Sequence, residues 1–323
     1  MPLLLFVVAL VIASLPLSLY ANGTEDSPRC NGHEELCGRP FNQVVFAATH
    51  NSMSNSDDGW VWPFQDHGIR RQLDDGIRML LIDTHPWESA ADLQRVRQGV
   101  PAANRAQFDA AVAKDTPRPG DYLCHMICAL GNEPLSTGLG DVRGFLESNP
   151  NEVMGIFFQD AVSASETAAQ FDAAGLTKYV YTHPDGAPWP TLGEMIRDGQ
   201  RLFVMAEVSG PPPGWYHQGW KVAQDTSFAV NDASKFDCAL NRGAAQNPLF
   251  LLNNWVARPV PTREDAAQVN SYSFLLHRAR ACWHERGQRP NFIAVNFYDI
   301  GDVFQVVDAL NRVRDNTLVG YAP

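Results

Sequence analysis

The sequence predicts a single-domain α/β protein built as a TIM-type (β/α) barrel, regular or distorted, over residues 41–323. Two observations carry this prediction: apolar runs of strand length recur with helix-like segments between them, and polar residues gather where these runs end. The chain has 323 residues, 45% of them hydrophobic, which is enough to bury a large core. Because the active site of such a barrel lies at the carboxyl ends of its strands, we expect the functional residues there.

The first 40 residues precede the predicted barrel. Residues 3–19 are apolar and uncharged, and the chain then turns polar. Since this run is shorter than the roughly 20 residues of a membrane span, residues 1–21 are predicted to be a secretory signal peptide, with an uncleaved anchor as the alternative. Residues 22–40 form an extension that contains Cys30 and Cys37. We therefore expect a secreted, extracellular protein.

Six cysteines agree with export to an oxidising compartment. Pairing of neighbours in sequence is one of several connectivities that six cysteines allow. Free buried thiols are the alternative, and a zinc site is a further interpretation of Cys124–Cys128, although no second Cys/His pair with matching spacing exists. The predicted disulfides are Cys30 with Cys37, Cys124 with Cys128, and Cys238 with Cys282.

Seven apolar runs are predicted strands: Val44–Ala48, Arg78–Ile82, Asp121–Leu123, Val153–Phe158, Leu202–Ala206, Leu249–Leu252 and Phe292–Val295. The segment Lys221–Val230 is the candidate for the eighth. Apolar residues at helical spacing predict helices at Gly138–Ser148, Asp265–Glu285 and Val303–Val313. Residues 92–116 and 210–219 are predicted to be loops or insertions.

Four titratable residues follow the first three predicted strands: His50, Asp83, His85 and His125. Two histidines that face one substrate can act as general base and general acid, because an unperturbed pKa of about 6.5 allows one to be neutral while the other is protonated. This pair suits cleavage of a phosphodiester by an internal hydroxyl. The charged phosphorane then needs a cation, either Arg78 or a bound Ca²⁺.

Five short motifs occur along the chain: Ala48–Ser52, Gly76–Asp83, Leu123–His125, Asn149–Val153, and Arg289–Tyr298 with Gly301–Asp302. Together they resemble the X domain of phosphatidylinositol-specific phospholipase C (PI-PLC), and more closely its secreted single-domain PLC-like phosphodiesterase relatives. The resemblance runs from about Phe41 to Asn311. It implies a TIM-type barrel in which His50 is the general base and His125 the general acid. The implied substrate is a phospholipid or another phosphodiester, met at a membrane surface in the case of a lipid.

The resemblance also implies candidate calcium ligands. Asn51 and Asp83 match positions that bind Ca²⁺ in the metal-dependent members. Since calcium prefers six to eight oxygen ligands, these two residues with Gln159 or Asp160 would make a weak site, completed by water and the substrate phosphate.

The sequence departs from the family pattern around the charge-neutralising group. Leu81 and Gln159 stand where metal-dependent members supply glutamates, and His85 stands where metal-independent bacterial members place an arginine. Two hypotheses stay open: a Ca²⁺ cofactor, or no cofactor and a site in which Arg78 or protonated His85 carries the positive charge.

Other polar and aromatic residues follow the later strands. Glu207, Asn254 and Asn296 are candidate contacts to a substrate headgroup, with satisfaction of backbone groups at the barrel rim as the alternative. Tryptophans in the predicted loops suit a lipid interface or a sugar platform, or burial under those loops. They are Trp60, Trp62, Trp87, Trp215 and Trp220.

The net charge of −11 and the pI near 5.2 argue against a nucleic-acid partner. We expect a monomer. One alternative function is cleavage of glycerophosphodiesters or sphingolipids, which the missing glutamate at Leu81 disfavours. The other is a barrel that binds inositol or lipid headgroups without turnover, which Leu81 and Gln159 favour and the two histidines oppose.

Overall fold

The computed structural model describes residues 29–313, so the predicted signal peptide at residues 1–21 lies outside the described residues. Eight parallel strands form a curled sheet in the order β7-β6-β5-β2-β1-β10-β9-β8, and no ladder within residues 29–313 joins β7 to β8. The fold is therefore a TIM-type (β/α) barrel that is open between these two strands. The strands are β1 (Phe46–Thr49), β2 (Met79–Pro86), β5 (Met154–Asp160), β6 (Leu202–Ala206), β7 (Tyr216–Gln218), β8 (Ala223–Asp225), β9 (Leu249–Asn254) and β10 (Phe292–Val295).

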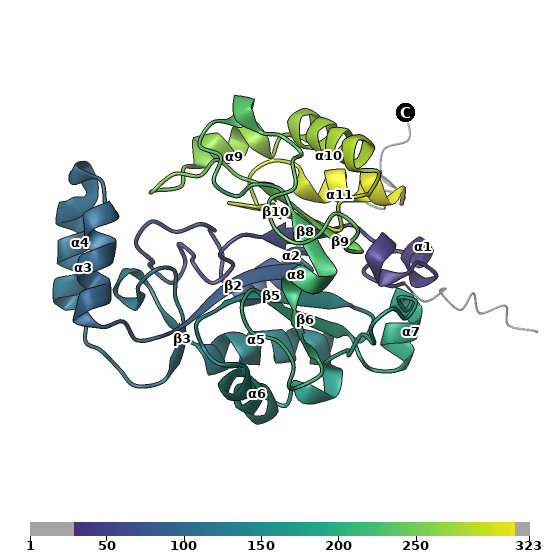
Figure 1. Cartoon of the computed structure of the whole chain (residues 1–323), viewed down its shortest axis with the longest axis horizontal. Helices are drawn as coiled ribbons and strands as arrows, with labels where there is room; N and C mark the ends of the chain where they lie inside the picture. The colour runs from purple at the N-terminus through teal and green to yellow at the C-terminus, as the bar shows by residue number, and fades with distance from the viewer. Residues whose placement is uncertain (1–28, 314–323) are drawn as a thin grey trace, which may run out of the picture.

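Helices cover the outer face of the sheet. In Figure 1, α5 and α6 lie below the strands, and α9, α10 and α11 lie above them. No helix of residues 29–313 is long and apolar enough to cross a membrane. The helices are α1 (Glu34–Cys37), α2 (Ile69–Asp75), α3 (Ala90–Gly99), α4 (Arg105–Lys114), α5 (Leu135–Ser148), α6 (Ala164–Ala173), α7 (Leu192–Arg197), α8 (Gly219–Val222), α9 (Arg263–Val269), α10 (Tyr272–Arg286) and α11 (Val303–Asn311).

Side chains of the strands alternate between the barrel interior and the helices, as the two-residue period of a strand requires. Phe46 and Phe292 belong to an interior cluster, whereas their neighbours Val45 and Ile293 pack with the helices. The N-terminal extension and Phe41, which follows it, close the barrel at the amino ends of the strands. There, the ring of Phe41 lies 5.1 Å from Phe46 and 6.2 Å from Phe292. We therefore expect the polar chemistry of the barrel at its opposite end, where the strands have their carboxyl ends.

Two of the strand predictions need correction. Asp121–Leu123 is strand β3, but it pairs antiparallel with the far end of β2 and with β4 (Glu133–Pro134), so it is not a barrel strand. The barrel strand that was missed is β7, within residues 210–219, because Tyr216–Gln218 is short and contains no apolar run. The other six predicted strands are confirmed, and Lys221–Val230 does contain the eighth strand, β8.

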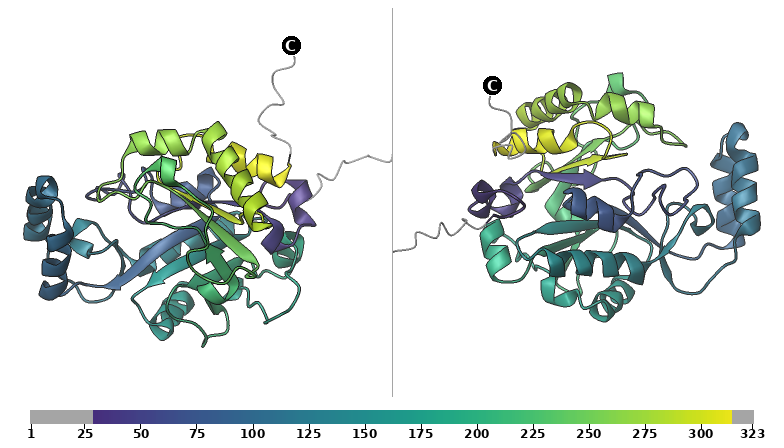
Figure 2. Two further views of the ribbon diagram at one scale, coloured as in Figure 1. Left: turned by 45° about the horizontal axis from the view of Figure 1, so that its top comes forward. Right: turned by 180° about the vertical axis from the view of Figure 1, so that it is seen from behind.

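Residues 92–116, predicted to be a loop or an insertion, are an insertion, and it is mostly helical. This insertion folds into a hairpin of α3 and α4 that stands apart from the barrel body (Figures 1 and 2). A capping box starts α3, in which the Ser89 hydroxyl accepts the Asp92 N–H and the Asp92 carboxylate accepts the Ser89 N–H. No residue of α3 is buried, and only Phe108 is buried in α4.

The helix predicted at 265–285 is two helices, α9 and α10, which meet at Asn270 and Ser271. Tertiary contacts cause the break: the Asn270 side chain donates to the backbone carbonyl of Asn296, and the Asp302 carboxylate accepts the N–H of Tyr272. The predicted helices at 138–148 and 303–313 are confirmed as α5 and α11.

All three predicted disulfides are present, and none of the six cysteines is free. The interpretations of free thiols and of a zinc site at Cys124–Cys128 are therefore wrong. The bond between Cys30 and Cys37 lies in the extension at the amino end of the barrel, and that between Cys124 and Cys128 lies at the carboxyl end.

Candidate active site

His50 lies directly after β1 and is held by three separate groups. Its backbone N–H donates to the backbone carbonyl of Val295 on β10, and its ring nitrogen Nδ1 lies 2.9 Å from the side-chain oxygen Oδ1 of Asn296. Its ring stacks on that of Trp255, with 3.8 Å between the centroids. Because a carboxamide oxygen only accepts, Nδ1 carries the proton and Nε2 is the basic nitrogen.

The surroundings of His50 favour its neutral form. Its pKa is lowered to about 4, chiefly by burial; the hydrogen bond from Nδ1 to Asn296 opposes this shift, and repulsion from His125 adds to it. At neutral pH the imidazole is therefore unprotonated, which is the state required of a general base.

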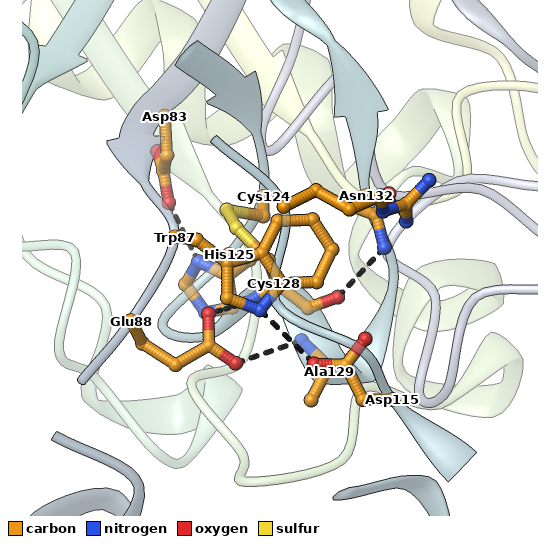
Figure 3. Close-up of a disulfide and its surroundings, with 10 residues drawn as sticks. Asp83, Trp87, Glu88, Asp115, Cys124, His125, Cys128, Ala129 and Asn132 are labelled. Carbon is orange, nitrogen blue, oxygen red and sulfur yellow. Dashed lines mark hydrogen bonds and ion pairs between the residues drawn. A yellow bond between two sulfur atoms is a disulfide. The ribbon is translucent and has the colours of Figure 1, made fainter. Parts of the chain in front are cut away.

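His125 projects from the loop that the Cys124–Cys128 disulfide closes. Its Nδ1 lies 2.7 Å from the carboxylate of Asp83 on β2, as Figure 3 shows. The Asp83 side chain is only 6% exposed, against 28% for His125. The Glu88 carboxylate accepts the N–H groups of Cys128 and Ala129 and so anchors the same loop (Figure 3). A carboxylate in this position orients an imidazole and stabilises an imidazolium.

Phe64 lies against both histidines. Its ring is edge-on to His50, at 5.1 Å between centroids, and edge-on to His125, at 4.8 Å. The loop after β1 is fixed in this place because the Gln65 amide donates to the carbonyl of His50 and the Phe64 carbonyl accepts the N–H of Phe297. The two histidines therefore flank one aromatic side chain at the barrel mouth.

A polar pocket of about 90 Å³ lies at this mouth, beside His50. Asn51, Asp83, Gln159 and Glu207 line it, as the sequence predicted for residues at strand ends. Asn51 is 2% exposed, and its Nδ2 has no hydrogen-bond partner within residues 29–313. Asn51 therefore has a buried donor without a partner beside the pocket.

Arg242 brings a cation to the polar pocket and was not predicted. Its guanidinium donates to Glu207 at 2.7 Å and to the fully buried Asp225 at 2.7 Å, and it stacks over Trp220 at 4.1 Å. Burial raises the pKa of Glu207, and the arginine opposes that shift. Because Arg242 lies in irregular chain between β8 and β9, no periodic pattern singles it out.

Six predicted residues do not line the polar pocket. Two of them, His125 and Asn296, are bonded to the lining residues Asp83 and His50. The other four are as follows. Arg78, at the start of β2, pairs with Glu152 at 2.7 Å and lies at the amino end of the barrel. His85 is half-buried, and burial lowers its pKa, which disfavours the charged form. The last two are Asp160, which accepts the N–H groups of Val208 and Ser209, and Asn254, which donates to Val269.

Strand alternation explains two of these differences. Gln159 faces the pocket, so the next residue, Asp160, points away from it. In the same way Asn253 lines the pocket and Asn254 does not, although the sequence suggested the latter. Asn296 holds the imidazole of His50, so its carboxamide oxygen is already engaged.

The oxygen-bearing residues at the mouth include Asn51, Asp83, Gln159 and Glu207, and both carboxylates among them already have partners. Within residues 29–313 no three or more His, Cys, Asp or Glu side chains are grouped so as to hold a metal. Of the carboxylates lining the pocket, Asp83 is bonded to His125 and Glu207 to Arg242. Calcium takes six to eight oxygen ligands from carboxylates, carbonyl groups and water, so any calcium here would compete with His125 and Arg242 for these two carboxylates.

Fold and site together define a PLC-like (β/α) barrel. A model of the family described as PI-PLC X 1 matches residues 107–311, which include His125 but begin after His50 and Asp83. The chain belongs to this PI-PLC X family.

Similar proteins in fungi and plants agree with this assignment. An uncharacterised secreted protein of Arthroderma benhamiae is 27% identical; the alignment covers 89% of this chain and 65% of that protein. A PI-PLC X domain-containing protein of Arabidopsis thaliana is 28% identical, over 85% and 63%. The chain thus spans slightly less than two thirds of these two relatives. PI-PLC X domain-containing protein 1 of A. benhamiae is 26% identical over 94% and 95%.

Solved structures show the same fold. A structure of phosphatidylinositol-specific phospholipase C from Staphylococcus aureus superposes with a TM-score of 0.52, and a mutant of that enzyme superposes with a TM-score of 0.54. Each covers 86% of this chain and 95% of its own, at 12% identity.

Proposed function

We propose that this protein is a phosphodiesterase of the phospholipase C type that cleaves by intramolecular attack, with His50 as general base and His125 as general acid. The observation that carries the proposal is the matched pair of imidazoles. Each has its Nδ1 held by an acceptor, Asn296 or Asp83, and neither Nε2 has a partner within residues 29–313. This is the arrangement that two proton transfers on one substrate require.

The reaction follows from these two nitrogens. Nε2 of His50 removes the proton of a substrate hydroxyl, whose oxygen attacks phosphorus. The bond from phosphorus to the leaving oxygen breaks, and that oxygen takes the proton from Nε2 of His125. The products are a cyclic phosphodiester and a free alcohol.

In this proposal, groups of the protein stabilise the negatively charged phosphorane. Arg242 and the Nδ2 group of Asn51 line the polar pocket and can donate to phosphate oxygens. The two engaged carboxylates, Asp83 and Glu207, support a reaction without calcium.

A secreted location is part of the proposal. Three disulfides suit an oxidising compartment, and one relative is named an uncharacterised secreted protein.

Phosphorus NMR of the purified protein with phosphatidylinositol tests this function. We expect a cyclic inositol phosphate signal in both added Ca²⁺ and EDTA, and its loss in His50→Ala and in His125→Ala with nearly unchanged thermal unfolding. A signal only with Ca²⁺ would assign the cation to a metal. Absence of product under both conditions would contradict the proposal for this headgroup.

A further inference from the structure

A second cavity, of about 330 Å³, is lined by Phe64 and His125. Its walls come from the loop after β1, from α3 and the turn that follows it, and from the loop that carries His125. The lining is mostly apolar and includes Trp60, Trp62, Val96, Val100 and Leu130.

The two arginines that line this cavity are both paired with carboxylates. Arg95 pairs with Asp92 at 2.7 Å, and its side chain is 75% exposed. Arg258 forms an ion pair with Asp265. Because both arginines are paired with carboxylates and most of the walls are apolar, the cavity suits a hydrocarbon group best.

The α3–α4 hairpin forms one wall of this cavity. Phe108 and Val100 pack with Ile127 and Leu130, which anchors the hairpin to the loop that carries His125. The helix α3 itself buries no residue, yet its Val96 faces the cavity. When a ligand covers an apolar side chain that is half-exposed in a cavity, the burial of that surface favours binding.

The two histidines give the cavities different roles. His50 lines the polar pocket, His125 lines the apolar cavity, and Phe64 contacts both rings. If His125 protonates the leaving oxygen, as the proposed function holds, the leaving alcohol lies on the side of the apolar cavity. The attacking headgroup then lies on the polar side.

The volume limits what the cavity holds. An apolar cavity of roughly 150 Å³ accommodates benzene, so about twice that volume accommodates one chain of roughly ten carbons, and not two full acyl chains. We propose that the cavity between α3 and the His125 loop binds one apolar chain of the substrate's leaving alcohol. The α3–α4 hairpin is then the element that selects a lipid substrate. This inference rests on the proposed function.

Binding of n-alkyl phosphates tests it without turnover. Monomeric phosphates with chains from butyl to dodecyl are titrated by calorimetry, with inorganic phosphate as the reference. Each methylene that enters an apolar cavity improves affinity about three- to four-fold. We expect that gain to continue to roughly ten carbons and then to stop.

Three variants test whether the alkyl chain of the ligand binds in this cavity. Val96→Trp fills the cavity and should abolish the dependence of affinity on chain length. Gly99→Phe is a second filling variant, because a side chain there starts in open space: a Cβ would meet no atom within 4 Å. Gln94→Trp is the matched control, since Gln94 is exposed on the same helix and does not line the cavity.

The outcomes separate the two proposals. Affinity that does not change with chain length in the unmodified protein, or a dependence that both filling variants retain, overturns the assignment of this cavity. A clear dependence that Val96→Trp and Gly99→Phe remove supports it, even if phosphatidylinositol yields no product. In that last case the proposed reaction fails and the chain-binding cavity stands.

Discussion

The imidazole of His50 lies parallel to the indole of Trp255, with 3.8 Å between the ring centroids and 4° between the planes. Trp255 directly follows β9, and His50 directly follows β1; both strands pair with β10. The indole covers one face of the imidazole and keeps water from it. This cover contributes to the burial that lowers the pKa of His50 to about 4.

Replacing Trp255 should therefore change the pH dependence of the reaction. In Trp255→Ala, water reaches His50, and its pKa rises from about 4 toward its ordinary value. The acidic limb of kcat/KM should move to higher pH, so that activity at pH 5 falls more than activity at pH 8. Trp283→Ala on α10 is the control. An acidic limb that does not move in Trp255→Ala would contradict this account of the shift.

Asp83→Asn tests the partner of His125. A carboxamide is nearly isosteric, but it offers an N–H as well as an oxygen and cannot stabilise an imidazolium as a carboxylate does. We expect kcat to fall by about a hundred-fold or more, with little change in thermal unfolding. The control is Asp160→Asn, since the Asp160 carboxylate bonds only backbone N–H groups. If both variants lose activity equally, Asp83 has no special role.

The Cys124–Cys128 disulfide should matter more for activity than for stability. It closes a loop of sequence separation 4 around His125, whereas Cys30 and Cys37 are 7 apart at the other end of the barrel. By loop entropy each bond contributes about 2–3 kcal/mol. Replacing Cys124 and Cys128 by serine should lower kcat at least ten-fold. The same replacement at Cys30 and Cys37 should lower the unfolding free energy and leave kcat nearly unchanged; equal kcat losses would refute the distinction.

Arg242→Gln tests which group neutralises the phosphorane. Loss of a cation in the polar pocket should lower kcat by about a hundred-fold in EDTA, and Arg242→Lys should retain part of the activity. Circular dichroism must accompany the assay, because the glutamine variant leaves Asp225 buried without its ion pair. Arg197→Gln, at the exposed end of α7, is the control. If Arg242→Gln is fully active without EDTA and loses that activity when EDTA is added, a metal ion and not Arg242 neutralises the phosphorane.

His50 should also affect stability below neutral pH. Its folded-state pKa of about 4 lies below its ordinary value, so between about pH 6.5 and pH 4 the unfolded chain binds a proton that the folded chain does not. The free energy of unfolding therefore falls as the pH decreases through this window, by about 3 kcal/mol from this residue.

Denaturant unfolding at pH 7 and pH 4 measures this contribution. His50→Gln lacks the titrating group, so its stability should fall by about 3 kcal/mol less than that of the unmodified protein. His284→Gln, an exposed position on α10, should behave like the unmodified protein. An equal fall in His50→Gln would show that His50 is not the buried neutral group described above.

Local patterns in the sequence determined most of the barrel. Continuous apolar runs such as Val153–Phe158 and Phe292–Val295 report burial on both faces, which is a property of the strand itself. Polar residues directly after such runs, among them His50 and Asp83, must lie at the carboxyl ends whatever the neighbouring strands are. The close spacing of Cys124 and Cys128 likewise suggested a pair.

Only the tertiary structure decided which of two adjacent side chains enters the site. Asn253 and Asn254 are chemically identical, and strand register turns one to the mouth and the other to Val269. Arg242 reaches the mouth from a segment with no periodic pattern, and the α3–α4 hairpin forms a cavity beside His125 by packing on a distant loop. Sequence periodicity reports how deeply each residue is buried, but register and packing between distant segments decide what each residue faces.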